Sequence, residues 1–212
     1  MKTVREVRVM KIQNLSPGGY AANTYLVTKG SSALLVDCAA PADAVLAALA
    51  KEGTTLAAIL LTHGHFDHML TLAEVKAKTG APILLSEGDS DLPADAVKNA
   101  HGVFFGESVS YPEPDTWLSD GDRLSFGDLT VTVRATPGHT KGSSLFLIED
   151  AIFTGDTVFA RGYGRYDLYG GDPEALFTSL TKLVELPKEN MIYPGHGAPA
   201  RLAVALKNLD LS

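Results

Sequence analysis

A chain of 212 residues in which 45% of the residues are hydrophobic can bury the core of one domain, and we predict a single domain over residues 1–212. The formal net charge of −7 disfavours a nucleic-acid partner, because proteins that bind a phosphate backbone usually present a basic face. The single cysteine excludes an internal disulfide framework and is typical of a reducing compartment.

Taken in chain order, the first ninety residues predict strands interrupted by two helices. Residues 1–8 alternate charged residues with valine, unlike a signal peptide, and no later stretch reaches the length of a membrane span, so we expect a cytoplasmic protein with no membrane partner. Strands are predicted at 4–12, 23–28, 33–37, 56–61 and 83–85. Pro41 opens and Gly53 ends one predicted helix, and Gly80 closes a second helix that contains residues 70–77.

The next segment, residues 86–116, has no clear period, and we predict a short helix at 94–100 inside a long excursion. Such an excursion is either a plain surface loop or a lid over a substrate, and Trp117 is expected to anchor it to the core. Beyond it, strands are predicted at 129–135, 144–148, 151–154 and 191–193, and helices at 173–186 and 200–208. This order, rich in strands and punctuated by helices, predicts the α/β class.

A cluster of metal-ligating residues directly follows the buried strand predicted at 56–61. Residues 62–68 read Thr-His-Gly-His-Phe-Asp-His and supply His63, His65, Asp67 and His68. Imidazole nitrogens and carboxylate oxygens are the ligands that zinc and other first-row metals prefer, and α/β proteins place ligands where strands end. We therefore predict a metal site here, the alternative being a histidine-rich surface loop that binds nothing.

Three further candidates share this setting at the end of a strand. His139 and His196 each follow a predicted strand and a Pro-Gly turn, and Asp156 follows Gly155 at the end of another strand. Glycine in such a turn lets another backbone approach closely. For one such histidine, an ordinary surface or core imidazole is an equally good interpretation, but the three residues together favour a metal site. His101 lacks this setting and is left out.

The order and spacing of these seven residues resemble the signature motifs of the metallo-β-lactamase superfamily, and the resemblance covers nearly the whole chain. It implies a four-layered αβ/βα sandwich, in which two mixed β-sheets lie face to face with helices outside. It also implies two divalent metal ions, one held by His63, His65 and His139 and the other by Asp67, His68 and His196, with Asp156 bridging. Zinc is the expected metal, with iron or manganese as alternatives, because His and Asp ligands accept each of them.

Within this superfamily, the details favour thioester hydrolases of the glyoxalase II type. Asp156 stands where dinuclear, broad-spectrum β-lactamases have a cysteine, and His65 stands where flavodiiron proteins have a glutamate. Residues 155–167 resemble a loop of short, single-domain glyoxalase II-like hydrolases, and also of persulfide dioxygenases. The dioxygenases typically have a Pro-Ala-His-Asp-like sequence where this chain has Pro-Gly-His-Gly at 194–197, which favours the hydrolases.

The resemblance implies hydrolysis of a small-molecule thioester of the S-lactoylglutathione (hydroxyacylglutathione) type by a metal-bridged hydroxide, with Asp67 and Asp156 as catalytic residues. The alternatives are a mononuclear Fe(II) persulfide dioxygenase, a lactonase or phosphodiesterase of the same superfamily, and a metal-binding protein without catalytic activity. The sequence does not predict an oligomeric state.

Four residues around the expected centre have predicted supporting roles. Arg161, Tyr163 and Arg165 are candidate contacts to an anionic substrate, because only 16 residues (212 − 196) follow His196, and full-length glyoxalase II binds glutathione through a C-terminal helical domain. Arg165 has an alternative role, which is to brace its loop by pairing with Asp167 or another acid. Asp37 is a candidate acceptor for the N–H of a ligand histidine, which would fix its tautomer, or else caps a turn.

Overall fold

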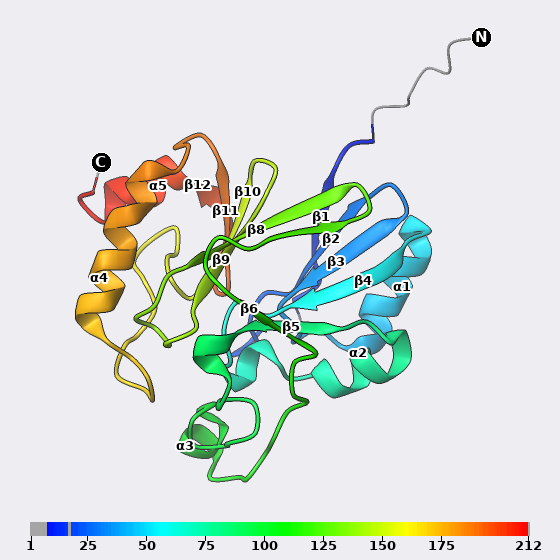
Figure 1. Ribbon diagram of the computed structural model, residues 1–212, viewed down its shortest axis with the longest axis horizontal. Coiled ribbons are helices and arrows are strands. Elements are labelled where there is room, and N and C mark those ends of the chain that lie inside the picture. The colour runs from blue at the N-terminus through cyan, green and yellow to red at the C-terminus, as the bar shows by residue number, and fades with distance from the viewer. Residues whose placement is uncertain (1–7, 17, 212) are drawn as a thin grey trace.

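Two six-stranded β-sheets lie face to face in the computed structural model, which describes residues 8–16 and 18–211 (Figure 1). The first sheet contains, in order, β1 (Lys11–Asn14), β2 (Tyr25–Lys29), β3 (Ser32–Val36), β4 (Thr55–Leu60), β5 (Ile83–Ser86) and β6 (Thr116–Leu118). The second contains, from one edge to the other, β12 (Ala200–Arg201), β11 (Met191–Pro194), β10 (Ala151–Gly155), β9 (Ser144–Ile148), β8 (Leu129–Ala135) and β7 (Arg123–Phe126). Both sheets are mixed, since β3 to β6 run parallel and so do β10 and β11, while the other neighbours are antiparallel.

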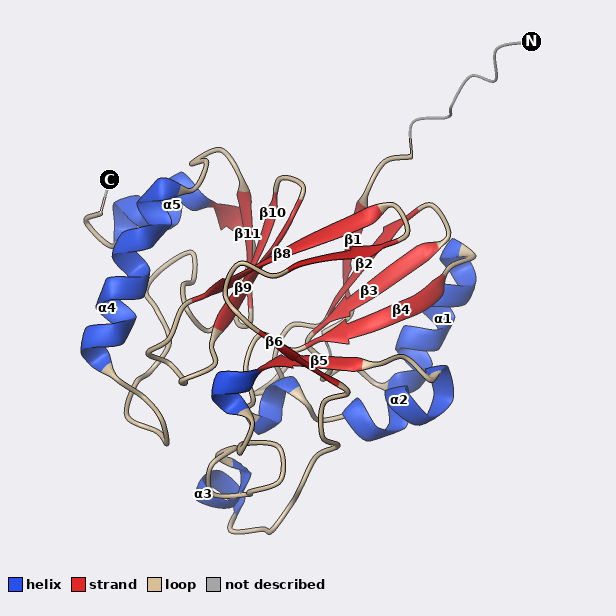
Figure 2. Cartoon of the chain, viewed as in Figure 1, coloured by secondary structure: helices blue, strands red, loops and turns tan. Residues whose placement is uncertain are grey.

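Helices cover the outer face of each sheet, as Figure 2 shows. The helices α1 (Ala42–Glu52) and α2 (Leu72–Thr79) pack on the first sheet, and α4 (Pro173–Lys182) and α5 (Leu202–Asn208) pack on the second. Three buried apolar clusters fill the spaces between these layers, one under each pair of helices and one between the sheets. The predicted four-layered αβ/βα sandwich is confirmed. None of the described helices is long and apolar enough to cross a membrane.

The parallel strands bring several loops to one end of the sandwich. The strand β4 pairs in parallel with β3, so the loops that follow Val36 and Leu60 leave the first sheet at the same edge. In the second sheet, β10 and β11 are parallel and end at Gly155 and Pro194. At this end the segment before β2 also contacts the second sheet, because the Asn23 N–H donates to the Gly195 carbonyl oxygen, which follows β11, at 2.7 Å. Residues that follow four strands therefore meet at one place.

Most predicted elements occur close to their predicted bounds, and the exceptions are short or irregular. The first strand, predicted at 4–12, begins only at Lys11, and residues 4–7 lie outside the described residues. The strands β6, β7 and β12 were not predicted, because each has four residues or fewer and few buried side chains. Trp117 does not anchor the excursion by burial, because its side chain on the edge strand β6 is 41% exposed.

The helix predicted at 94–100 is wrong, because residues 91–100 form turns and the helix α3 follows at His101–Phe105. Ala100 has φ of 70°, a left-handed conformation that interrupts a right-handed helix. The short helix α3 projects from the end of the sandwich at which the strand-end loops meet (Figure 1). It therefore places its side chains close to those loops.

Candidate metal centre

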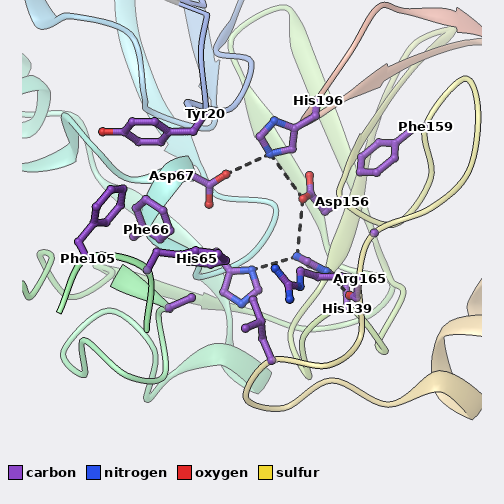
Figure 3. Close-up of a pocket in the computed structure, with 14 residues that line it drawn as sticks. Tyr20, His65, Phe66, Asp67, Phe105, His139, Asp156, Phe159, Arg165 and His196 are labelled. Atoms are coloured by element: carbon purple, nitrogen blue, oxygen red, sulfur yellow. Dashed lines mark hydrogen bonds and ion pairs between the residues drawn. The ribbon is translucent and has the colours of Figure 1, made fainter. Parts of the chain in front are cut away.

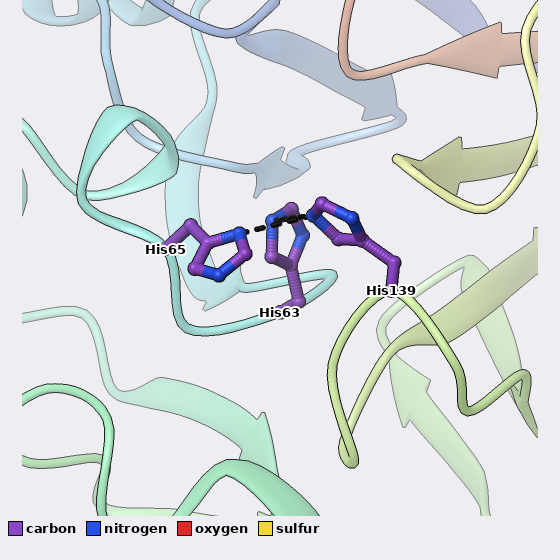
Figure 4. A group of neighbouring side chains, drawn as sticks. All are labelled: His63, His65 and His139. Carbon is purple, nitrogen blue, oxygen red and sulfur yellow. Dashed lines mark hydrogen bonds between the residues drawn. The ribbon is translucent and has the colours of Figure 1, made fainter. Parts of the chain in front are cut away.

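Three histidine rings meet at the end of the sandwich, two from the loop after β4 and one from the loop after β8 (Figure 4). The Nε2 atom of His139 lies 3.0 Å from Nδ1 of His65 and 3.2 Å from Nε2 of His63. All three side chains are buried. Two ligand nitrogens on a tetrahedral zinc ion, each about 2.0–2.1 Å from it, lie roughly 3.3 Å apart. The spacing of these nitrogens is therefore close to that of a metal site.

The other nitrogen of two of these rings fixes which atom carries the proton. Nδ1 of His139 lies 2.6 Å from the carbonyl oxygen of Arg165, which can only accept, so Nδ1 carries the hydrogen and Nε2 is left with its lone pair. Nδ1 of His63 lies 3.2 Å from the Thr62 hydroxyl, whose own proton is donated to Asp37. The Nε2 lone pairs of His63 and His139 consequently face one another, an arrangement that suits a cation between them.

A second group lies beside the first and contains two carboxylates and two histidines. Oδ2 of Asp67 is 3.0 Å from Nε2 of His196 and 3.8 Å from Nε2 of His68. Asp156 lies between the two groups, because its Oδ1 is 3.4 Å from Nε2 of His68 and its Oδ2 is 3.7 Å from Nε2 of His139 and 3.6 Å from Nε2 of His196. Nε2 of His68 and Oδ1 of Asp156 are buried without a hydrogen-bond partner. Buried polar atoms of this kind normally have a partner, and a bound cation would supply one here.

Asp37 holds the second group from behind. Its carboxylate is 2% exposed and accepts hydrogen bonds from the backbone N–H of Thr62 at 2.8 Å and from the Thr62 hydroxyl at 2.9 Å. Its Oδ2 also lies 2.8 Å from Nδ1 of His68, so Nδ1 carries the hydrogen and Nε2 points toward Asp67 and Asp156. One buried carboxylate thus orients His68 directly and His63 through Thr62.

The charges of the two groups differ. Burial, with the neighbouring histidines, lowers the pKa of His63 well below its usual value and that of His65 to about 3. Burial opposes the charged form of His68 as well, but the carboxylates of Asp37, Asp67 and Asp156 outweigh it and raise the pKa of that ring. The Asp156 carboxyl is also buried, yet the adjacent histidines lower its pKa below the ordinary range. Neutral imidazoles and ionised carboxylates are the forms that bind metals. His63, His65 and Asp156 favour these forms already, whereas a cation bound beside His68 would have to displace the proton that the carboxylates hold there.

Glycine allows the loops to approach this closely. A Cβ on Gly195 would lie 2.3 Å from Oδ1 of Asp156 and 2.6 Å from Cε1 of His68. A Cβ on Gly164 would lie 2.0 Å from the carbonyl oxygen of Asp156 and 2.9 Å from Nδ1 of His139. All four distances are shorter than van der Waals contact, so neither Gly195 nor Gly164 has room for a side chain.

Asp89, in the excursion between β5 and β6, clamps the loops that carry the first three histidines. Its buried carboxylate accepts from the backbone N–H groups of Gly64 at 2.9 Å and Gly142 at 2.7 Å and from the Thr140 hydroxyl at 2.8 Å. Gly64 separates His63 from His65, and Thr140 follows His139. Sequence reasoning missed this residue, because residues 86–116 have no period and two of its three partners are backbone groups.

Replacing Asp89 by asparagine is expected to weaken metal binding roughly 10- to 100-fold, because the amide N–H₂ must face a hydrogen-bond donor and the two loops then lose their common acceptor. The measurement is the metal retained after dialysis against graded concentrations of a chelator. Asp91→Asn is the matched control, since Asp91 is an exposed acid two residues away that pairs with Lys98. Equal metal retention in the two variants would contradict the clamp.

A cavity of about 490 Å³ opens directly onto the candidate metal centre (Figure 3). Five residues of the two groups line it: His65, Asp67, His139, Asp156 and His196. The other lining residues are Tyr20, Phe66, Ala100, Phe104, Phe105, Phe159, Gly164, Arg165 and Leu168. A substrate in this cavity would therefore contact both groups at once.

The three residues predicted to contact an anionic substrate are placed differently from one another. Arg165 lines the cavity, but its Nε and Nη2 atoms both donate to Asp167, at 2.7 and 2.8 Å, which is the bracing pair considered above. Tyr163 packs against Phe177 of α4, with ring centroids 5.5 Å apart. Neither Tyr163 nor Arg161 is among the described residues that line the cavity.

Comparison with known proteins agrees with this geometry. Residues 17–196 match the family model described as the metallo-beta-lactamase superfamily. The chain is 34% identical over 191 residues to the probable metallo-hydrolase YqgX of Bacillus subtilis, an alignment that covers 89% of this chain and 90% of that protein. It is also 39% identical over 174 residues to a hydroxyacylglutathione hydrolase of Brucella anthropi, covering 81% of this chain and 59% of that protein.

Two solved structures resemble the whole chain. One is BLEG-1, described as a B3 metallo-beta-lactamase, with a TM-score of 0.87 and 30% identity, covering 96% of this chain and 100% of that one. The other is TTHA1623 in a di-iron-bound form, with a TM-score of 0.78 and 34% identity, covering 93% of this chain and 98% of that one.

Proposed function

Because this chain belongs to the metallo-beta-lactamase superfamily, we propose that it is a metal-dependent hydrolase that cleaves thioesters of the hydroxyacylglutathione type. The observation that carries the proposal is the meeting of two ligand groups around Asp156 at the floor of an open cavity. The choice of a thioester is supported by the identity of 39% with the Brucella anthropi hydroxyacylglutathione hydrolase.

In this proposal, the two groups hold two divalent cations, with zinc expected first and iron as the main alternative, since TTHA1623 was solved in a di-iron-bound form. His63, His65 and His139 would hold one cation, Asp67, His68 and His196 would hold the other, and Asp156, which lies between the two groups, would be shared by them. Such a pair of cations would supply an activated water at neutral pH and would polarise the carbonyl that is attacked.

Asp67 is the residue placed to orient the attacking water. Its carboxylate lines the cavity and lies 3.0 Å from Nε2 of His196. Burial opposes the ionised form of Asp67, but His68 and His196 lower its pKa below the ordinary range, so it is ionised at neutral pH. An ionised carboxylate accepts a hydrogen bond from the water and directs the oxygen toward the thioester carbon. The C–S bond then breaks, and the products are a carboxylic acid and a thiol.

The test is thiol release from S-lactoylglutathione by the protein loaded separately with zinc, iron or manganese. Turnover is expected that is lost after chelation and returns when the metal is restored. A thiol-reactive chromogenic disulfide can serve as the detector, because the lone Cys38 is buried and burial raises its pKa to about 12. Absence of turnover with all three metals, in protein shown to contain them, would overturn the assignment.

β-Lactam hydrolysis is the second candidate, favoured by the close structural resemblance to BLEG-1. The thioesterase remains the first candidate, because the chain is 39% identical to the Brucella anthropi hydroxyacylglutathione hydrolase and 30% identical to BLEG-1. Hydrolysis of a chromogenic cephalosporin, compared with that of the thioester at equal enzyme concentration, separates the two. Oxygen consumption with a glutathione persulfide and one iron per chain would instead indicate the dioxygenase.

A further inference from the structure

One wall of the cavity is built from aromatic side chains of three separate segments, which we call the aromatic wall: Tyr20, Phe66, Phe104 and Phe105. Tyr20 comes from the segment before β2, and Phe104 and Phe105 come from α3. Phe66 comes from residues 62–68 after β4, which we call the histidine loop. Figure 3 shows Tyr20, Phe66 and Phe105 together beside Asp67. Phe105 is central, since its ring centroid lies 5.6 Å from that of Tyr20 and 5.5 Å from that of Phe66.

Three of the four rings in the aromatic wall are exposed to solvent, although aromatic rings are largely apolar. Tyr20 is 60% exposed, Phe104 52% and Phe105 47%, whereas Phe66 beneath them is 6% exposed. A contiguous group of exposed aromatic rings in a concave site is the usual sign of a surface that a ligand covers. The aromatic wall is continuous with the candidate metal centre, because Phe66 stands between His65 and Asp67 in the chain and all three line the cavity.

The described residues that line the cavity offer no unpaired cation apart from the histidines of the centre. Arg165 is the one arginine or lysine among them, and its side chain is engaged by Asp167 through two hydrogen bonds. Its guanidinium carbon also lies 5.5 Å from the ring centroid of Phe104, so the half-exposed arginine side chain flanks the aromatic wall. An aromatic ring in this cavity, by contrast, finds four other aromatic rings to pack against.

We propose that the aromatic wall binds an apolar, aromatic substituent of the substrate, so that the protein prefers aryl or arylalkyl thioesters to small polar ones. The inference rests on the proposed thioester hydrolysis and narrows its substrate class. The carbonyl carbon is attacked at the candidate metal centre while the ring packs against Phe105 and Phe104. The substituent can belong to the acyl group or to the thiol, and both present the same ring to the wall.

Three acyl thioesters separate these arms: S-acetyl-N-acetylcysteamine, its S-phenylacetyl analogue, and S-benzyl thioacetate. Each kcat/KM is divided by the rate constant of alkaline hydrolysis of the same substrate. We expect this corrected value to be about tenfold or more higher for one of the two aromatic substrates than for S-acetyl-N-acetylcysteamine, the acetyl substrate. The aromatic substrate with the higher corrected value shows whether the acyl group or the thiol of the thioester faces the aromatic wall. Equal corrected values for all three substrates would overturn the proposal.

The variant Phe105→Ala is expected to remove most of this preference, measured as the ratio of the corrected kcat/KM of the aromatic substrate to that of the acetyl substrate. Phe105→Tyr keeps the ring and should retain the preference. Phe177→Ala is the matched control, because Phe177 on α4 is 46% exposed and lies outside the cavity lining. A preference that survives Phe104→Ala and Phe105→Ala together would count against the aromatic wall.

Binding of a thioether that cannot be hydrolysed, S-benzyl-N-acetylcysteamine, keeps this test separate from that of the catalytic function. Calorimetry should show binding to the wild-type protein and at least about tenfold weaker binding to Phe105→Ala, whether or not any thioester is cleaved. If the protein binds this thioether but cleaves none of the three thioesters, the proposed thioesterase activity is overturned and the aromatic wall is not. Equal affinity of the two proteins would overturn the wall alone.

Discussion

Replacing Asp156 by alanine is expected to lower the kcat/KM for a thioester by at least about 10³-fold and to reduce the metal content below that of the wild type. The reason is the position of its carboxylate, whose two oxygens lie within 3.4 to 3.7 Å of ligand-type nitrogens of His68, His139 and His196. Without this carboxylate, both groups of candidate ligands lose the negative charge that the second sheet contributes. The measurements are steady-state kinetics and the number of metals per chain.

Asp156→Asn and Asp150→Ala sharpen that experiment. Asparagine keeps one oxygen and nearly the same volume, so the fold is preserved while the charge that both groups share is lost. Asp150, an exposed acid in the turn between β9 and β10, is the control for removing a carboxylate from the same hairpin. An Asp156→Ala protein that holds as much metal as the Asp150→Ala protein would show that Asp156 is not a ligand.

Replacing Asp37 by alanine is expected to lower the free energy of unfolding of the metal-free protein by about 3–5 kcal/mol. The substitution leaves the Thr62 backbone N–H, the Thr62 hydroxyl and Nδ1–H of His68 buried without an acceptor. Asp37 also adopts φ of 57°, a left-handed conformation that aspartate and asparagine tolerate better than alanine does. The measurement is urea unfolding in the presence of a chelator, which excludes any effect of lost metal.

Two comparisons test the reason given for Asp37. Asp43→Ala removes an exposed carboxylate on α1 that pairs with Lys78, and is expected to leave the urea concentration at the unfolding midpoint nearly unchanged. Asp37→Asn, which retains one acceptor oxygen, should fall between the wild type and Asp37→Ala. If Asp37→Ala unfolds at the same urea concentration as the wild type, the buried network contributes nothing to stability.

The sequence predicts the parts of this molecule that leave a local signal. The strand before the histidine loop is a continuous apolar run, and β4 forms there; the helix that Gly53 was predicted to end stops at Glu52, with Gly53 in a left-handed conformation. The grouping of His139, Asp156 and His196 with the histidine loop followed from their shared place at strand ends, and the structure brings these side chains together. Their roles as metal ligands remain a prediction.

Features that depend on contacts between distant segments leave no such signal. Asp89 acts through backbone groups 25 and 53 residues away, so nothing in its neighbourhood marks it. The aromatic wall joins Tyr20 to α3, about eighty residues later, and the helix in this excursion was predicted to begin at residue 94, seven residues before α3 begins. Arg161 and Tyr163 were predicted from their position in a loop, and neither lines the cavity. The sequence of a loop does not determine which way its side chains point.

The candidate metal centre also lies on the seam between the two sheets. The ligands from the loop after β4 belong to the first half of the chain, and His139, Asp156 and His196 follow strands of the second sheet. Each proposed cation would therefore tie the two halves of the sandwich together, much as a crosslink closes a loop of 70 to 130 residues. The concentration of free metal would then determine the free energy of unfolding as well as the activity, and the protein would unfold more readily where that metal is scarce.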